Sequence, residues 1–447
     1  MIEGYVVSVH ARVLILARDD SLAGPLADGL DRLGWRTVTG RGIYAGIAAL
    51  ADLQIEAAII DVASYGEEAR DVALRLKAAS GQRRLPVIAI GRPIPGDNLS
   101  AFDLTLAAPL HPAQAAFRLE SLVRTATAQE EFELRAETFL ERGQLLDPPD
   151  PGAEPWRVLA VGDPAPQFLA LSNALTRNGA EVVGAFTAYT AFDYLHDQPF
   201  EAVVLWAGDD RAEALSIAAG MRRNTRLYHI PALLYLRPDA EIGLNEVFHR
   251  GVSDVATAHT PETETAERVI ELAKAYRHQA SIRRALNRAR GSGLMEAVTG
   301  LFTRDLFAAH LARLTLSSRQ RNRPLSVCVL KLTEQPELAP LRADGWVDRA
   351  VPQIGSMIGR LVRSEDTAAR LGPETFALAL PSTRLQSARA AAERIAAVIG
   401  CTAFDAGEGR PPFVVEFDIG VAEVERGESA ATALERAAAR LHQAKAS

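Results

Sequence analysis

The segment RVLILARDD at residues 12–20 recurs as RVLAVGDPA at residues 157–165, and the surrounding sequence repeats with it. The segment IEAAIIDVAS at 55–64 likewise matches FEAVVLWAGD at 200–209. The spacing stays at 145 residues throughout: Arg12, Gly34, Ala57, Pro86 and Arg92 recur as Arg157, Gly179, Ala202, Pro231 and Arg237. Similarity at a fixed spacing indicates a repeated structural unit. The sequence therefore predicts two consecutive copies of one domain.

Each copy contains several short runs rich in Val, Ile and Leu, which are bounded by Asp, Gly or Pro. Continuous apolar runs of this length are typical of strands that are buried on both faces of a parallel sheet. Between them lie helical stretches with Leu and Ala three or four residues apart, such as residues 21–34 and 67–80. This alternation predicts two doubly wound α/β domains.

The composition of the 447-residue chain is that of a globular protein with about three domains, since 48% of its residues are hydrophobic and 23% are charged. The formal net charge of −7 argues against non-specific binding to nucleic acid. Its two cysteines, Cys328 and Cys401, are too few for a disulfide framework and favour a reducing cytoplasm. Because no run of about 18 uncharged apolar residues occurs, we expect no membrane span.

Two features separate the domains. The Pro- and Asp-rich stretch LLDPPDPGAEP at 145–155 predicts an exposed linker. A helical pattern at 267–290 holds six Lys or Arg and no acid from Lys274 onward. It favours either a basic docking helix or, more ordinarily, a solvated connector. The predicted division is a first domain at 1–142, a linker at 143–156, a second domain with its connecting helix at 157–290, and a mixed α+β domain at 291–447.

The repeats resemble the receiver domains of two-component response regulators, because the third predicted strand of the first copy ends in Asp61. The resemblance implies flavodoxin-like domains with five parallel strands, and it makes Asp61 the possible phospho-acceptor. Other receiver residues are missing: Ala17 and Arg18 stand at the metal-binding acidic pair, and Ala108 replaces the lysine. In the second copy the acceptor position is Trp206, which predicts a packing or dimerisation role. An ordinary loop carboxylate is an equally good interpretation of Asp61.

Residues 294–447 resemble the GGDEF domain of diguanylate cyclases, which has an adenylate-cyclase-like α+β fold. The resemblance rests on MEAVTGLFTRDLF at 295–307, LVRSEDTAARLGPETFALALP at 361–381 and AAAERIAAVI at 390–399. With two receiver-like domains ahead of it, the chain resembles proteins of the PleD type. Such cyclases condense two GTP molecules into cyclic di-GMP with divalent cations.

The active site of this domain is predicted to be degenerate. The signature loop Gly-Gly-Asp/Glu-Glu-Phe reads Gly372, Pro373, Glu374, Thr375 and Phe376 here. Pro373 fixes φ and removes an N–H where the family uses glycine to bring the backbone close to the nucleotide. Lys331 stands where the family has a metal-binding aspartate, and its charge repels Mg²⁺. Glu374 is retained as a ligand, but we expect no catalytic residue, no bound metal and no required cofactor.

The resemblance also implies a ligand site. Cyclases carry an Arg-x-x-Asp motif five residues before the signature loop, where cyclic di-GMP binds as a product inhibitor. Arg363 and Asp366 match this motif with the family spacing, Arg394 matches an additional family arginine, and Arg389 lies on the same helix. An arginine donates to O6 and N7 of guanine while a carboxylate accepts from its N1 and N2 hydrogens. The alternative is a surface ion pair of little energetic weight.

Three functional hypotheses follow. The preferred one is a non-catalytic cyclic di-GMP effector, in which the receiver-like domains form a homodimer or bind a protein partner. By resemblance, it would be a cytoplasmic adaptor, located at the cell pole, for the regulated proteolysis of cell-cycle regulators. The alternative enzyme is a weak diguanylate cyclase regulated by phosphorylation at Asp61. The third hypothesis is a scaffold that binds no nucleotide.

Overall fold

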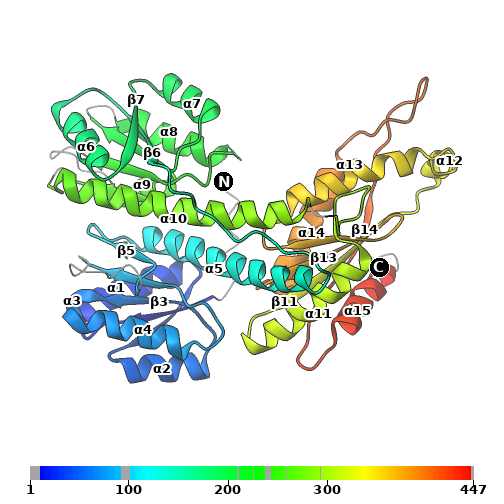
Figure 1. Ribbon diagram of the computed structural model, residues 1–447, viewed down its shortest axis with the longest axis horizontal. Helices are drawn as coiled ribbons and strands as arrows, with labels where there is room; N and C mark the ends of the chain where they lie inside the picture. The colour runs from blue at the N-terminus through cyan, green and yellow to red at the C-terminus, as the bar shows by residue number, and fades with distance from the viewer. Residues whose placement is uncertain are drawn as a thin grey trace.

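A computed structural model describes residues 11–91, 101–208, 211–224, 226–236, 243–257, 259–291 and 293–443. Arg92 and Arg237, the last pair of the repeat, lie outside these ranges. The two α/β domains lie one above the other in Figure 1, with two long helices running between them toward the third domain. The predicted fold class is confirmed in all three domains.

The first domain contains a five-stranded parallel sheet with strand order β2-β1-β3-β4-β5. All seven residues of the central strand β3 are buried, as its continuous apolar run predicts. The elements are β1 (Arg12–Leu16), α1 (Asp20–Arg32), β2 (Arg36–Gly40), α2 (Ile43–Asp52), β3 (Ile55–Asp61), α3 (Val62–Tyr65), the 3₁₀ turn η1 (Gly66–Glu68), α4 (Ala69–Ala79), β4 (Val87–Ile90), β5 (Leu104–Leu106) and α5 (Pro112–Leu140).

The second domain repeats this topology, with strand order β10-β9-β8-β6-β7 and parallel pairing throughout. The prediction of a tandem repeat is therefore confirmed. Its elements are β6 (Trp156–Val161), α6 (Pro166–Arg177), β7 (Ala180–Ala185), α7 (Ala188–Asp197), β8 (Ala202–Ala207), α8 (Arg211–Arg223), β9 (Ala232–Leu236), α9 (Leu244–His249), β10 (Asp254–Ala256) and α10 (Glu262–Ala289).

The third domain is built on a four-stranded antiparallel sheet with strand order β12-β13-β11-β14. The apolar run FVVEFDIGVA at 413–422 predicts a strand, but strand β14 begins only at Phe417, four residues after the start of the run. The elements are α11 (Arg304–Gln320), β11 (Leu325–Leu332), η3 (Pro336–Leu338), α12 (Ala339–Ala343), α13 (Trp346–Leu361), β12 (Thr367–Gly372), β13 (Thr375–Pro381), α14 (Leu385–Gly400), β14 (Phe417–Glu423) and α15 (Ala430–Gln443).

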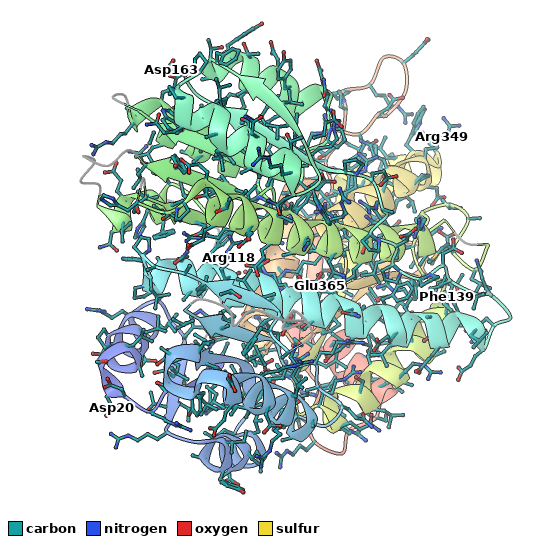
Figure 2. All side chains as sticks on the ribbon, turned by 60° about the vertical axis from the view of Figure 1, so that its left-hand side comes forward. Asp20, Arg118, Phe139, Asp163, Arg349 and Glu365 are labelled. Carbon is teal, nitrogen blue, oxygen red and sulfur yellow. The ribbon has the colours of Figure 1, made fainter. Side chains whose placement is uncertain are left out.

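Helices α5 and α10 join the two receiver-like domains through buried polar contacts. Gln114 on α5 donates from Nε2 to Asp254 Oδ1 at 2.7 Å, and Arg268 on α10 forms an ion pair with the same carboxylate at 2.8 Å. Arg118, which is labelled in Figure 2, donates to the carbonyl oxygen of Ser253 at 3.1 Å. These hydrogen bonds specify how the two domains pack.

Part of the basic run on α10 belongs to domain interfaces, although Lys274, Arg284 and Arg288 are exposed. Arg277 is 5% exposed, donates to the carbonyl oxygens of Glu154 and Pro155, and lies 3.8 Å from the ring centre of Trp156. This side chain therefore anchors the start of the second domain to α10. The interpretation of the run as a solvated connector does not hold for this part of the helix.

Stability is predicted to depend on pH through Glu271 on α10. Burial, followed by the nearby Asp254 carboxylate, raises the pKa of Glu271 to about 7, although Lys274, Arg118 and Arg268 act in the opposite direction. Because the pKa is higher in the folded state, the protonated carboxyl of Glu271 contributes fully to the free energy of unfolding below about pH 4.3. This contribution is lost as the pH rises through about 7, where the buried carboxyl must ionise. We expect Glu271→Gln to stabilise the protein at about pH 8 by about 1–2 kcal/mol and to leave it unchanged at about pH 4.

Thermal unfolding at several pH values measures this effect. Glu267→Gln, which changes an exposed residue four positions earlier on the same helix, is the matched control and should shift the unfolding temperature little at any pH. An equal stabilisation by both variants at pH 8 would show that general charge, and not the environment of Glu271, is responsible.

Candidate functional site

In the first domain, the carboxylate of Asp61 caps a helix. Asp61 is 7% exposed, and its side chain accepts hydrogen bonds from the backbone N–H of Ala63 at 3.1 Å and from the Ser64 hydroxyl at 2.5 Å. Arg18 lies beside this cap, because its backbone N–H donates to Ser64 Oγ and its guanidinium pairs with Glu68. The acceptor carboxylate therefore already has two internal partners. Phosphorylation of Asp61 stays a prediction.

Neither nearby acid is directed at Asp61. Asp19 accepts hydrogen bonds from the backbone N–H and the hydroxyl of Ser21, which lower the pKa of its carboxyl. Asp20 forms an ion pair with Arg41 at 2.5 Å. The carboxylate of Asp19 therefore caps the first turn of α1, and that of Asp20 pairs with an arginine that follows β2.

In the second domain an indole ring occupies the acceptor position. Trp206 is 4% exposed and stacks on Tyr235, with ring centres 5.1 Å apart. Its ring also packs edge-to-face against the ring of Phe168, with ring centres 6.3 Å apart. A Cβ at position 162 would lie only 2.4 Å from the Cβ of Trp206, so Gly162 is required beside this ring. This end of the sheet is packed as hydrophobic core.

The signature loop of the third domain connects β12 and β13, and Glu374 lies in it. Arg342 on α12 donates from Nε to Glu374 Oε1 and from Nη2 to Glu374 Oε2, both at 2.9 Å. The same guanidinium donates to the carbonyl oxygen of Thr333 at 3.0 Å. The hydrogen bonds from Arg342 to Glu374 raise the pKa of the arginine. The retained acid of the loop is therefore neutralised by a bidentate ion pair.

Lys331 lies on β11 opposite Thr375. Its ammonium group forms an ion pair with Glu334 at 3.1 Å. Within the described ranges, no group of three or more His, Cys, Asp or Glu side chains could hold a metal ion. With a lysine at one ligand position and an arginine bound to the remaining glutamate, these residues do not fit the pair of divalent cations that diguanylate cyclases use.

The Arg-x-x-Asp segment forms the turn between α13 and β12 and lines a cleft of about 820 Å³. The walls come from α5, residues 228–229 of the second domain, α10, the end of α13 and α14, so the cleft lies where all three domains meet. Figure 2 shows Glu365 beside α5 and α10. Six arginines line the cleft: Arg124, Arg283, Arg290, Arg360, Arg363 and Arg394. Glu365 is the single acid among its described lining residues.

Among the described residues, four of these arginines have no hydrogen-bond or ion-pair partner for the guanidinium group, although the charge of Arg363 acts on the nearby Asp366 carboxyl. No described residue forms a hydrogen bond or ion pair with the guanidinium groups of Arg283, Arg360, Arg363 and Arg394. In contrast, Arg124 pairs with Glu120, and Arg290 donates to the carbonyl oxygen of Gly359. The charge of the wall also acts on His229, since burial and then Arg283 and Arg124 lower its pKa to about 3. The lining of the cleft therefore carries an excess of positive charge, with six arginines against one glutamate.

The structure brings together two of the four predicted ligand residues. Arg363 and Arg394 both line the cleft. Asp366 lies beneath the turn at 6% exposure, and its Oδ2 accepts a hydrogen bond from the backbone N–H of Arg363 at 3.0 Å. Burial, followed by the neighbouring Glu365 carboxylate, raises the pKa of Asp366 to about 7. Arg389 is exposed on α14 and is not part of the lining.

Sequence reasoning missed four lining arginines. Arg283 and Arg290 belong to the basic run on α10, which the sequence singled out without placing it at the site. Arg360 lies in the last turn of α13, and Arg363 follows the end of that helix. Arg124 lies on α5 of the first domain, and no pattern in the sequence connects it with a motif 239 residues away.

Residues 294–447 match the family model described as "Diguanylate cyclase, GGDEF domain". The C-terminal domain is a GGDEF domain. Over 402 residues, the chain is 24% identical to the response regulator PleD of Caulobacter vibrioides. This aligned region covers 87% of this chain and 87% of PleD. Its organisation of two receiver-like domains followed by a GGDEF domain is therefore PleD-like.

Two solved structures are also similar to the GGDEF domain. The GGDEF domain of DgcB from Caulobacter crescentus in complex with c-di-GMP is 23% identical, with a TM-score of 0.32, over 34% of this chain and 88% of that chain. The FimX GGDEF domain from Pseudomonas aeruginosa is 22% identical, with a TM-score of 0.31, over 34% of this chain and 93% of that chain. None of the helices in the described part of this chain combines the length and apolar character needed to cross a bilayer.

Proposed function

We propose that this protein is a non-catalytic effector that binds cyclic di-GMP in the cleft beside the Arg-x-x-Asp turn. The observation that carries the proposal is one cleft, bordered by the GGDEF domain and both receiver-like domains, in which four arginine side chains form no hydrogen bond or ion pair with a described residue; Arg363 and Arg394 are among them. Guanidinium groups match both the phosphodiester oxygens and the O6/N7 edge of guanine in geometry and charge. A small dianionic nucleotide would neutralise part of this wall.

The absence of cyclase activity is the second part of the proposal. A GGDEF cyclase positions GTP through metal ions held by acidic side chains. In this chain, Arg342 binds Glu374 through two hydrogen bonds, and Lys331 replaces an acid. Both changes place a cation where the reaction requires metal ions, which supports binding without turnover.

The receiver-like domains are proposed to bind protein partners or a second copy of the chain. Asp61 is held as a helix cap, and Trp206 fills the second acceptor position, so neither domain favours phosphorylation as its main role. The sequence resembles PopA, a PleD-like cyclic di-GMP effector of bacterial cell-cycle control. By that resemblance we propose a cytoplasmic, polar, dimeric adaptor for regulated proteolysis.

Calorimetric titration of the full-length protein with cyclic di-GMP, together with incubation with GTP and Mg²⁺, tests the proposal. We expect saturable binding in the first experiment and no cyclic di-GMP formation in the second. Sustained production of cyclic di-GMP that Glu374→Gln abolishes would instead support the weak cyclase, and phosphorylation at Asp61 should then increase it. A protein that neither binds cyclic di-GMP nor forms it would be a scaffold, contrary to the proposal.

A further inference from the structure

The Arg-x-x-Asp turn rests on a buried arginine from the first receiver-like domain. Arg135, near the end of α5, is 1% exposed. Its Nη2 donates to the hydroxyl of Thr367 at 3.1 Å and lies 3.5 Å from the carbonyl oxygen of Asp366. These two acceptors form the end of the turn, which begins with Arg363 in the cleft. The underside of the turn is therefore held by a different domain.

Arg135 is itself held by a buried polar network. Glu131, one turn earlier on α5, accepts from Nε and Nη2 of Arg135 at 3.2 and 2.8 Å. The same carboxylate oxygen accepts from the hydroxyl of Thr367 at 3.3 Å and lies 2.9 Å from Nε2 of His310 on α11. Thr138 completes the network, with its hydroxyl 3.0 Å from Nδ1 of His310. All five residues are at most 1% exposed.

Arg135 also reaches the second receiver-like domain. Its Nη1 lies 3.5 Å from the carbonyl oxygen of Leu286 on α10, and its guanidinium lies 5.5 Å from the ring centre of Phe302 in the GGDEF domain. One side chain therefore contacts α5, α10 and the GGDEF domain. Arg283, which lines the cleft, lies on α10 close in sequence to Leu286.

Stability alone does not explain this arrangement. A buried ion pair that is replaced by apolar side chains of similar volume often leaves a protein equally stable, because desolvation of the charges offsets their attraction. Such pairs are better at specifying geometry, since every donor and acceptor requires one arrangement. The geometry specified here is that of Asp366 and Thr367, which follow Glu365 at the end of the turn.

We propose that Arg135 is a positioning residue for the ligand-binding turn, so that the terminal helix of the first receiver-like domain sets the affinity of the cleft. The inference rests on the proposed function, because it takes cyclic di-GMP as the ligand. Without Arg135, the carbonyl oxygen of Asp366 and the hydroxyl of Thr367 lose a common donor. The turn then samples more conformations, and the ligand must order it on binding, which lowers the affinity.

The double variant Glu131→Gln/Arg135→Met isolates this role. It removes both charges together, so neither member of the pair is left as an unpaired buried charge, and it replaces each side chain with one of similar volume. The amide carbonyl oxygen that the substitution introduces at position 131 can still accept from His310. Arg135→Lys serves as the conservative variant, since an ammonium group can donate to Asp366 and Thr367 without forming the fork to Glu131.

Arg313→Gln is the matched control. Arg313 on α11 pairs with Glu137 at 2.7 Å and with Glu141 at the end of α5. Its Nε also donates to the hydroxyl of Thr138 at 3.2 Å, at the edge of the network, but it forms no hydrogen bond or ion pair with residues 363–367. It therefore tests the docking of α5 against the GGDEF domain without removing the support of residues 363–367.

Two measurements on the full-length protein give the test. In the free protein, amide hydrogen exchange of residues 363–367 should become about tenfold faster in the double variant, partly recover in Arg135→Lys, and stay unchanged in Arg313→Gln. The dissociation constant of cyclic di-GMP, measured by calorimetry, should rise about tenfold in the double variant alone. The positioning role would be overturned if residues 363–367 exchanged in the double variant at the wild-type rate. It would also be overturned if Arg313→Gln accelerated their exchange equally.

The exchange measurement separates this inference from the proposed function. If the wild type does not bind cyclic di-GMP, the proposed function fails, whereas exchange in the free protein still decides whether Arg135 holds the turn. If the wild type binds and the double variant exchanges faster without losing affinity, the turn is held by Arg135 but does not set the affinity, and the inference is wrong.

Discussion

Arg363→Gln is expected to weaken the binding of cyclic di-GMP by about 30-fold, which corresponds to about 2 kcal/mol. The guanidinium of Arg363 forms no hydrogen bond or ion pair with a described residue and lies on the cleft wall at the start of the turn. A ligand phosphate or guanine edge would therefore be its first strong partner. Removing it leaves the ligand group desolvated beside an amide, which cannot form a charged fork. Calorimetric titration of the full-length variant measures the loss.

Variants of other arginines make this experiment decisive. Arg394→Gln should cause a similar loss, because Arg394 lines the same cleft. Arg389→Gln distinguishes the prediction from the sequence motif from that of the structure. The motif predicts a loss of affinity for cyclic di-GMP, whereas the structure places this side chain outside the lining and predicts no loss. Arg288→Gln changes an exposed arginine of α10 outside the lining, so it controls for total charge. Equal binding by the wild type and Arg363→Gln would mean that the ligand site lies elsewhere.

Arg323→Met is expected to destabilise the contact between the first receiver-like domain and the GGDEF domain by about 3 kcal/mol. Arg323 precedes β11, is 7% exposed and bonds Glu130 on α5, while its Nε lies 3.1 Å from Glu56 Oε2 at the start of β3. Glu130 and Glu56 are themselves 4% and 8% exposed. The substitution removes a buried cation between two buried carboxylates, which costs more than the pairs contribute. Glu130 keeps the backbone N–H of Arg84, and Glu56 keeps the amide of Gln54.

Scanning calorimetry measures this effect, because a three-domain protein need not unfold in one step. For a domain of about 150 residues, about 3 kcal/mol corresponds to a decrease of about 6–12 °C in unfolding temperature. Arg410→Met is the matched control: Arg410 pairs with Asp344 at 2.7 Å, but both side chains are nearly half exposed. Removing that pair should cost less than about 1 kcal/mol. Equal shifts for the two variants would contradict the structural role of Arg323.

The fold could be predicted from the sequence to a large extent, because its elements follow local patterns. The buried run that ends in Asp61 forms β3, and its counterpart 145 residues later forms β8. The five parallel strands that the resemblance to receiver domains implies are confirmed in both copies. The sequence pattern places the start of β14 too early, since the apolar residues Phe413 and Val415 pack in the core without belonging to the strand.

The candidate site could be predicted only in part. The motif locates Arg363, because the spacing to the signature loop identifies the turn, and Arg394 follows from the same family pattern. The orientation of Asp366 could not be predicted, because its carboxylate turns inward to the backbone N–H of Arg363. Spacing along the chain places a residue in a turn but does not say which side of the turn is covered by another helix.

The sequence by itself determined the tandem repeat, the class of each domain and the position of the Arg-x-x-Asp turn, since periodicity and short motifs are local properties. Only the tertiary structure decided that the turn faces Arg124 of α5 and Arg283 of α10, and that Arg135 supports it from below. These residues are brought together by the packing of α5 and α10 between the domains. Contacts at such sequence separations depend on the whole fold, so no local pattern encodes them.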